Sequence, residues 1–212
     1  MIDTLTAPAL PQKPLSGSPE EEMINYILQF APLTAAEIKF LLENIKVQSF
    51  PKGKVLIREG QYAKRCYFVM KGCVRQYYLV DGEEKTTNFF TEGQPITASE
   101  GNLNMNPVKY YLSCLEDCIL TLGTPEDEVR MFQAFPHFES ICRVAVEDEL
   151  GKNQEKLASY IINSPEERYL NLLETRPDLL ERVPQYQLAS YLGIKPESLS
   201  RIRKRIMVRV TS

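Results

Sequence analysis

The chain has 212 residues, 43% of them hydrophobic and 25% charged, and its formal net charge is −3. This length is sufficient for a sizeable core, and the net charge excludes a chain that is uniformly basic for nucleic-acid binding. No segment approaches the roughly eighteen apolar residues of a membrane span or has the pattern of a signal peptide, so we expect a cytoplasmic protein with no membrane partner. Five cysteines spread through apolar segments indicate free thiols rather than disulfides.

The N-terminal part of the chain is expected to be disordered and then helical. Four prolines among small polar residues predict a disordered leader at residues 1–22. Met23 is an alternative to Met1 as the natural first residue. Residues 20–46 place apolar side chains at helical spacing, which predicts two helices, and Thr34 begins the capping box of the second.

From about residue 47 the apolar period changes to the alternation of β-strands. Short β-rich runs are predicted at residues 55–57, 66–70, 74–80, 85–90, 110–114 and 118–122. Turn pairs such as Asp81-Gly82 separate them, and Asp-Gly between alternating runs is typical of a β-hairpin. Many short strands at near-regular spacing predict a double-sheet roll or barrel.

After the strands the helical period returns. Pro136 ends a short helical segment, and a long helix is predicted from about residue 138 to residue 162. Its expected apolar stripe consists of Ile141, Val144 or Ala145, Asp148, Leu157 and Ile161. This stripe either packs on the sheet or forms a dimer seam, and we favour the seam. Ser164-Pro165-Glu-Glu predicts the start of another helix.

The end of the chain has the pattern of a helix-turn-helix. Leu188, Ala189 and Leu192 form one apolar face of a first short helix. Gly193 follows where a left-handed residue lets the chain leave the helix, and Pro196 suits the first turn of a second helix. The inner face of that second helix is formed by Leu199, Ile202 and Ile206. The second helix of such a motif enters the DNA major groove.

The outward face of this second helix carries polar side chains that suit DNA. Glu197, Ser200 and Arg201 are predicted to contact bases, because Arg can fork onto guanine and Glu can accept from cytosine. The predicted phosphate contacts are Gln185, Ser198, Arg203, Lys204 and Arg205. Residues 198–212 contain five basic and no acidic side chains, so basic charge is concentrated on this element.

A roll, then a long helix and a C-terminal helix-turn-helix together resemble the Crp/Fnr family of bacterial transcription regulators. The most specific points are the turns at Gly53, Glu59-Gly60 and Lys71-Gly72, and the run Glu197-Ser-Leu-Ser-Arg201. That run is similar to the Glu-x-x-Ser-Arg recognition helix of the oxygen-sensing branch, which implies base contacts by Glu197, Ser200 and Arg201. Residues 164–174 are similar to Bacteroidetes members.

The resemblance implies an α+β fold. Its parts are a β-roll sensor at residues 23–135 (a cyclic-nucleotide-binding-like jelly roll, or double-stranded β-helix), a dimerisation helix at 136–162 and a winged helix-turn-helix at 163–212. It also implies a homodimer on a palindromic operator in double-stranded DNA. An unidentified small-molecule effector is expected, and RNA polymerase is a candidate partner.

The sensing chemistry of the family is only partly matched. Its cyclic-AMP-binding members carry a Gly-Glu pair for the ribose and an arginine for the cyclic phosphate. Here the nearest substitutes in a candidate effector pocket are Ser99, Glu100 and Lys109, and no arginine lies between Arg75 and Arg130. A lysine lacks the bidentate fork of arginine. We therefore expect no cyclic AMP binding in the family manner, with a cyclic-AMP- or cyclic-GMP-activated regulator as the alternative.

No cofactor or metal is expected. The first cysteine is Cys66, too late for the N-terminal cysteine cluster of an iron–sulfur sensor, and His137 is the single histidine. A remote alternative is a cupin-like enzyme that binds small molecules, but such an enzyme needs two or three histidine ligands. We therefore expect a protein that is not an enzyme.

Overall fold

The computed structural model describes residues 18–28, 31–63, 65–96 and 107–210. The fold is of the α+β class. Helices α1 (Pro19–Ile27) and α2 (Ala35–Asn44) precede eight strands: β1 (Lys46–Phe50), β2 (Val55–Ile57), β3 (Cys66–Lys71), β4 (Val74–Val80), β5 (Glu83–Phe90), β6 (Pro95–Ile96), β7 (Tyr111–Cys114) and β8 (Cys118–Gly123). The remaining helices are α4 (Pro125–Ala134), α5 (His137–Ile162), α6 (Pro165–Thr175), α7 (Asp178–Arg182), α8 (Gln185–Tyr191) and α9 (Pro196–Val210).

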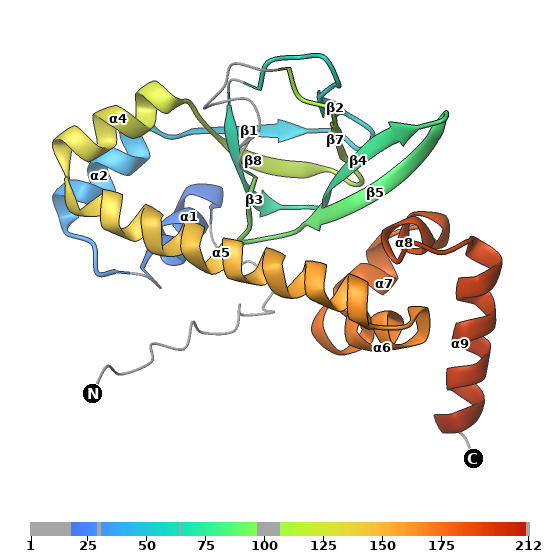
Figure 1. The fold of residues 1–212 in the computed structure, drawn as a ribbon. Helices are drawn as coiled ribbons and strands as arrows, with labels where there is room; N and C mark the ends of the chain where they lie inside the picture. Colours follow the sequence, from blue (N-terminus) through green and yellow to red (C-terminus); the bar gives the residue numbers. More distant parts are fainter. Residues whose placement is uncertain (1–17, 29–30, 64, 97–106, 211–212) are drawn as a thin grey trace.

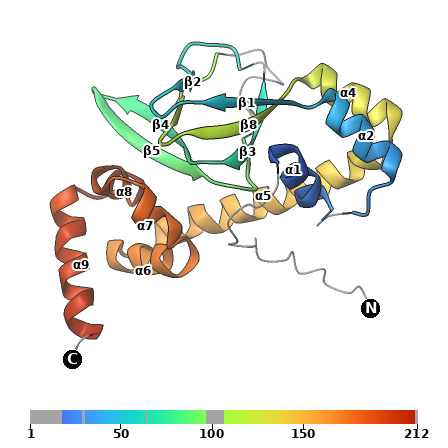
Figure 2. The same ribbon diagram turned by 180° about the vertical axis from the view of Figure 1, so that it is seen from behind.

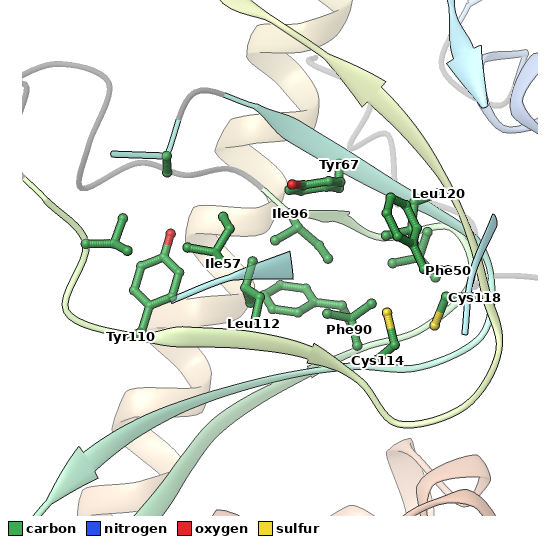
Figure 3. Close-up of a cluster of buried hydrophobic side chains, with 14 residues drawn as sticks. Phe50, Ile57, Tyr67, Phe90, Ile96, Tyr110, Leu112, Cys114, Cys118 and Leu120 are labelled. Carbon is green, nitrogen blue, oxygen red and sulfur yellow. The ribbon is translucent and has the colours of Figure 1, made fainter. Parts of the chain in front are cut away.

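The strands form a roll of two four-stranded sheets, as the alternating pattern predicts. One sheet has the order β1-β8-β3-β6 and the other the order β2-β7-β4-β5, and neighbouring strands are antiparallel in both sheets. Apolar side chains from both sheets fill the space between them, among them Tyr67, Phe90, Leu112 and Leu120 (Figure 3). Burial of these side chains is the main favourable contribution to the stability of the roll.

Helices close one end of the roll. Met23 and Ile24 of α1, Leu41 of α2 and Phe138 of α5 share a buried cluster with Met70 of β3. From this end α5 runs along the roll and leads to helices α6 to α9 (Figures 1 and 2). The predicted long helix is therefore present, and it joins the two parts of the molecule.

Two expectations differ from the structure. Helix α1 begins at Pro19, within the segment expected to be a leader, because Ser18 and Glu21 cap it reciprocally: Ser18 N donates to Glu21 Oε2 (3.0 Å) and Glu21 N to Ser18 Oγ (3.3 Å). Residues 1–17 lie outside the described residues. The second difference is the wing: residues 163–210 contain four helices and no strand, so the expected wing has no counterpart among them.

Candidate nucleic-acid interface

Helices α8 and α9 form the predicted helix-turn-helix. Leu188 and Ala189 of α8 are buried against Leu199 and Ile202 of α9 in one apolar cluster. Gly193 leaves α8 with φ +70°, and the amide of the next residue donates to Ala189 O (3.0 Å). This is the left-handed helix ending that glycine adopts without steric cost.

The predicted base-contacting side chains share one exposed face of α9. Glu197, Ser200 and Arg201 are all exposed, as is Lys204 one turn further along. Within the described part of the chain, neither Arg201 nor Lys204 forms an ion pair. Helix α9 lies at the end of the molecule away from α2 and α4 (Figures 1 and 2). These cations are therefore free to meet an anionic partner.

The predicted phosphate-contacting residues are less uniform. Gln185 and Ser198 are exposed, but Arg203 is half-buried beside the packing face. Arg205 is exposed and forms an ion pair with Glu166 at the start of α6. The sequence could not indicate this pair, because its partners are far apart in the chain. Arg205 therefore has to break its ion pair with Glu166, or bind both groups at once, when it contacts a phosphate.

The helix-turn-helix is fixed to the roll by polar contacts on α8. Ser190 Oγ accepts from Thr86 N (2.9 Å) and donates to Glu84 O (3.0 Å), so one side chain bonds the edge of β5 twice. The buried guanidinium of Arg75 donates to Thr86 Oγ1 (2.9 Å) and forms an ion pair with Glu84. The position of α8 thus depends on the β4–β5 hairpin.

Helix α5 contributes a half-buried amine to the contact between α8 and the roll. Lys156 Nζ donates to Thr87 O and Asn88 Oδ1 (2.9 Å each) and lies 4.6 Å from the ring centroid of Tyr191 in α8. Burial, helped by the nearby Arg176, lowers the pKa of Lys156 to about 8. One side chain therefore connects α5, the roll and the helix-turn-helix.

A second set of polar contacts joins the roll to the C-terminal helices, where Arg182 of α7 contacts two acids of the roll. It donates to both carboxylate oxygens of Glu92 (2.8 and 2.9 Å) and to Glu116 (3.0 Å from Nε). Burial alone would raise the pKa of Glu92, but hydrogen bonds from Arg182 and from Gly72 N hold it below its usual range. Bidentate pairs of this kind fix orientation as well as contributing energy.

An open cavity of about 1160 Å³ lies beside the contacts made by Arg75, Lys156 and Ser190. Its lining combines the β4–β5 hairpin, α5 and the turn before α9, and includes Arg75, Lys156, Tyr160, Tyr186 and Lys195. Sequence reasoning missed this junction, because it depends on contacts between segments that are distant in the chain.

The candidate effector residues are only partly within the described structure. Val108 is buried and Lys109 exposed, so Lys109 points away from the roll interior, although both residues precede β7 and do not lie on a strand. Ser99 and Glu100 lie outside the described residues. Arg75, the last arginine before these positions, faces the contact with α5 and α8 and not the apolar cluster inside the roll.

The described residues also include the single histidine of the chain. His137 forms a pair with the buried Glu37 (3.0 Å) between α5 and α2. In this part of the chain no group of three or more His, Cys, Asp or Glu is placed to hold a metal ion. None of its helices is both long enough and apolar enough to span a bilayer.

Comparison with known proteins supports the architecture. Residues 47–133 match the family model of the cyclic nucleotide-binding domain. The structure is similar to the c-di-GMP-responsive global regulator CLP of Xanthomonas campestris, with 19% identity, 83% of this chain and 93% of that chain covered, and a TM-score of 0.64. No match was found among curated proteins.

Two further solved structures share the fold. FixK2 of Bradyrhizobium japonicum is 17% identical over 78% of this chain and 85% of its own, with a TM-score of 0.64. The catabolite activator protein of Thermus thermophilus is 19% identical over 85% of this chain and 86% of its own, with a TM-score of 0.52. The roll and the helices after it thus have the same fold as these proteins.

Proposed function

We propose that the protein is a homodimeric, sequence-specific DNA-binding transcription regulator of the Crp/Fnr type, without enzymatic activity. The observation that carries this proposal is the exposed polar face of α9, with Glu197, Ser200, Arg201 and Lys204 on a helix whose opposite face is buried. Arg and Glu at such positions suit base edges in the major groove, and Lys suits phosphate.

The exposed face of α5 supports the dimer. Val146, Leu150, Leu157 and Ile161 recur at spacings of four and seven residues, and each is between 56% and 73% exposed. At 100° per residue these four side chains lie within about 60° of one another around the helix. Large apolar side chains rarely remain exposed in a row along a helix. The seam differs from the stripe expected from the sequence, because Ile141 packs against the α1–α2 cluster and Asp148 pairs with Lys152 (2.6 Å).

The roll is proposed to be an effector domain that does not hold cyclic AMP in the family manner. Its described interior is apolar, and its one buried arginine, Arg75, is bonded to Thr86 and Glu84 at the outer junction. The alternative is a regulator activated by a cyclic nucleotide, which the domain match favours. The names of the similar structures, a c-di-GMP-responsive regulator and a catabolite activator, support a regulator that responds to an effector.

Selection from randomised double-stranded DNA tests the proposal. A symmetric dimer is expected to enrich two inverted half-sites centred about 10 base pairs, or a multiple of that, apart. Recovery of single half-sites would argue against the dimer. Recovery of no consensus, with affinity equal to that for random DNA, would argue against sequence-specific binding.

A further inference from the structure

Two cysteines face each other across the end of the roll nearest to the DNA-binding helices. Cys114 ends β7 and Cys118 begins β8, and the short turn at residues 115–117 connects them. These strands belong to different sheets, so the two side chains enter the same core from opposite sides (Figure 3). Each is 1% exposed.

The two thiols lie beside one another, and Cys118 is hydrogen-bonded to the backbone. Their contact raises the pKa of Cys114 and lowers that of Cys118. Cys118 Sγ in turn lies 3.3 Å from Glu116 O and 3.6 Å from Cys73 O. By the direction of these pKa shifts, Cys118 is the more acidic of the two thiols, and Cys114 lies beside it.

The backbone next to this pair requires a glycine, Gly72. A Cβ atom on Gly72, which has φ +100°, would lie 2.6 Å from Cys118 Sγ and 2.8 Å from Asp117 O. The backbone of the turn between β3 and β4 therefore packs directly against the Cys118 sulfur. Any movement of Cys118 must displace this backbone or the β7–β8 turn.

The outer side of the β7–β8 turn contacts the DNA-binding helices. Leu115 packs against the apolar cluster of α6 to α9, and its amide donates to Cys73 O (2.8 Å). Cys73 belongs to that same cluster, and Glu116 accepts from Arg182 of α7. The turn that joins the two thiols is thus also part of the contact between roll and DNA-binding helices.

We propose that Cys114 and Cys118 form a reversible dithiol–disulfide pair, oxidised by hydrogen peroxide, whose state is transmitted through the turn at residues 115–117 to the DNA-binding helices. The Cys118 thiolate attacks one peroxide oxygen, the O–O bond breaks, and the leaving hydroxide takes a proton to form water. This step leaves Cys118 as a sulfenic acid.

The Cys114 sulfur then attacks the sulfenic sulfur, the S–O bond breaks, and the thiol proton leaves with the hydroxyl group as a second water. Two thiols lose one electron each, and one peroxide gains two. Reduction by an added dithiol reverses the reaction through thiol–disulfide exchange.

The disulfide removes the Cys118 S–H donor that Glu116 O and Cys73 O share. It also draws the two sulfurs to about 2.05 Å and so pulls the strand ends together. Both changes act on the turn that holds Leu115 and Glu116 against the helices. Because the thiols are buried, peroxide reaches them when the turn opens locally, and opening requires the Glu116–Arg182 contact to loosen.

Mass spectrometry of the peroxide-treated full chain tests the pair directly. No Lys or Arg lies between Lys109 and Arg130, so trypsin releases both cysteines in one peptide, residues 110–130. After denaturation and alkylation, we expect this peptide mainly without alkyl groups and lighter by two hydrogen atoms, and dithiothreitol should restore it. A Cys66→Ser/Cys142→Ser variant serves as the control and should give the same disulfide.

Variants of the pair identify the order of attack. Cys114→Ser should trap Cys118 as a sulfenic acid that dimedone labels, whereas Cys118→Ser should give neither disulfide nor label. The proposed pair would be overturned if peptide 110–130 of the natural protein were alkylated at both cysteines at a peroxide concentration that oxidises Cys142. This outcome concerns the natural protein, so it holds even where the variants fail to fold. This measurement does not depend on DNA binding.

Transmission to the helices has a separate readout. Hydrogen exchange of residues 176–191 should increase when the disulfide forms, and Glu116→Gln should speed disulfide formation by loosening the turn. Lys71→Gln, a charge change on the neighbouring exposed position at the end of β3, is the control and should leave the rate unchanged. A disulfide that forms with unchanged exchange in residues 176–191 would overturn the transmission.

Discussion

The hydroxyl oxygen of Tyr160 lies 2.1 Å from the position that a Cβ atom on Gly193 would occupy. Helix α5 therefore contacts the turn of the helix-turn-helix itself, at a residue whose φ of +70° already favours glycine. The proposed dimer helix and the proposed DNA-reading motif are thus in direct contact.

Gly193→Ala should destabilise the fold through two effects. The left-handed backbone costs an alanine about 1–2 kcal/mol, and the new methyl group also displaces Tyr160. In a Tyr160→Ala background the second effect is removed, so a double-mutant cycle in urea should give a coupling of at least about 0.5 kcal/mol. Gly151→Ala is the control: it lies inside α5 with open space around it and should stabilise by up to about 1 kcal/mol. Equal costs of Gly193→Ala in both backgrounds would show that the contact is not formed.

Lys156 should make stability depend on pH in the alkaline range. Its pKa of about 8 in the folded protein lies below the value of about 10.4 in an unfolded chain, so the unfolded state binds more protons between these values. The free energy of unfolding of the natural protein should therefore rise relative to that of Lys156→Met as pH increases from 8 to 10. Partial exposure keeps the gain below about 3 kcal/mol. Parallel pH curves for the two proteins would contradict a half-buried amine.

The α5 seam should respond to a buried charge. Leu150→Glu is expected to dissociate the dimer, because two carboxylates would face each other across the symmetric seam. Leu42→Glu, at an exposed position of α2, should leave the dimer intact. Sedimentation velocity of both variants distinguishes the two cases. A dimer that persists in Leu150→Glu would place the interface elsewhere.

Cyclic AMP should not bind measurably at micromolar concentration. Burying a cyclic phosphate without a bonded counter-charge costs several kcal/mol, and Lys109 points away from the roll interior. Calorimetric titration with cyclic AMP and cyclic GMP checks this expectation. Affinity tighter than about 10 µM, corresponding to about −7 kcal/mol, would instead favour the nucleotide-activated alternative, as would its loss in Lys109→Ala.

Local signals predicted local structure well. The Gly193 turn and Pro196 lie within a few residues of the helices that they separate, so their conformational preferences alone locate the helix-turn-helix. The Ser164-Pro-Glu-Glu signature likewise begins a capped helix. The same signature at Ser18 was overlooked among the leader prolines, although it caps α1 in the same way.

Long-range relationships could not be predicted in the same way. Arg182 meets Glu92 and Glu116 from 90 and 66 residues away, and no periodicity encodes such a pair. Along α5, Ile141 and Leu157 look equally apolar in sequence, but only Leu157 is exposed. Only the packing of Ile141 against the N-terminal helices separates them.

The central claim is that α9 reads DNA sequence, and Arg201→Ala tests it most directly. Arg201 is exposed, so its loss should leave fold and dimer intact. Because a guanine contact contributes about 1–3 kcal/mol per half-site, affinity for the selected operator should fall at least about tenfold while affinity for random DNA stays nearly the same. Lys204→Ala is the matched control: it should weaken both DNAs alike and lower the slope of log K against log[salt] by about 0.9 per subunit. An Arg201→Ala protein whose operator affinity changes less than about threefold would contradict the account.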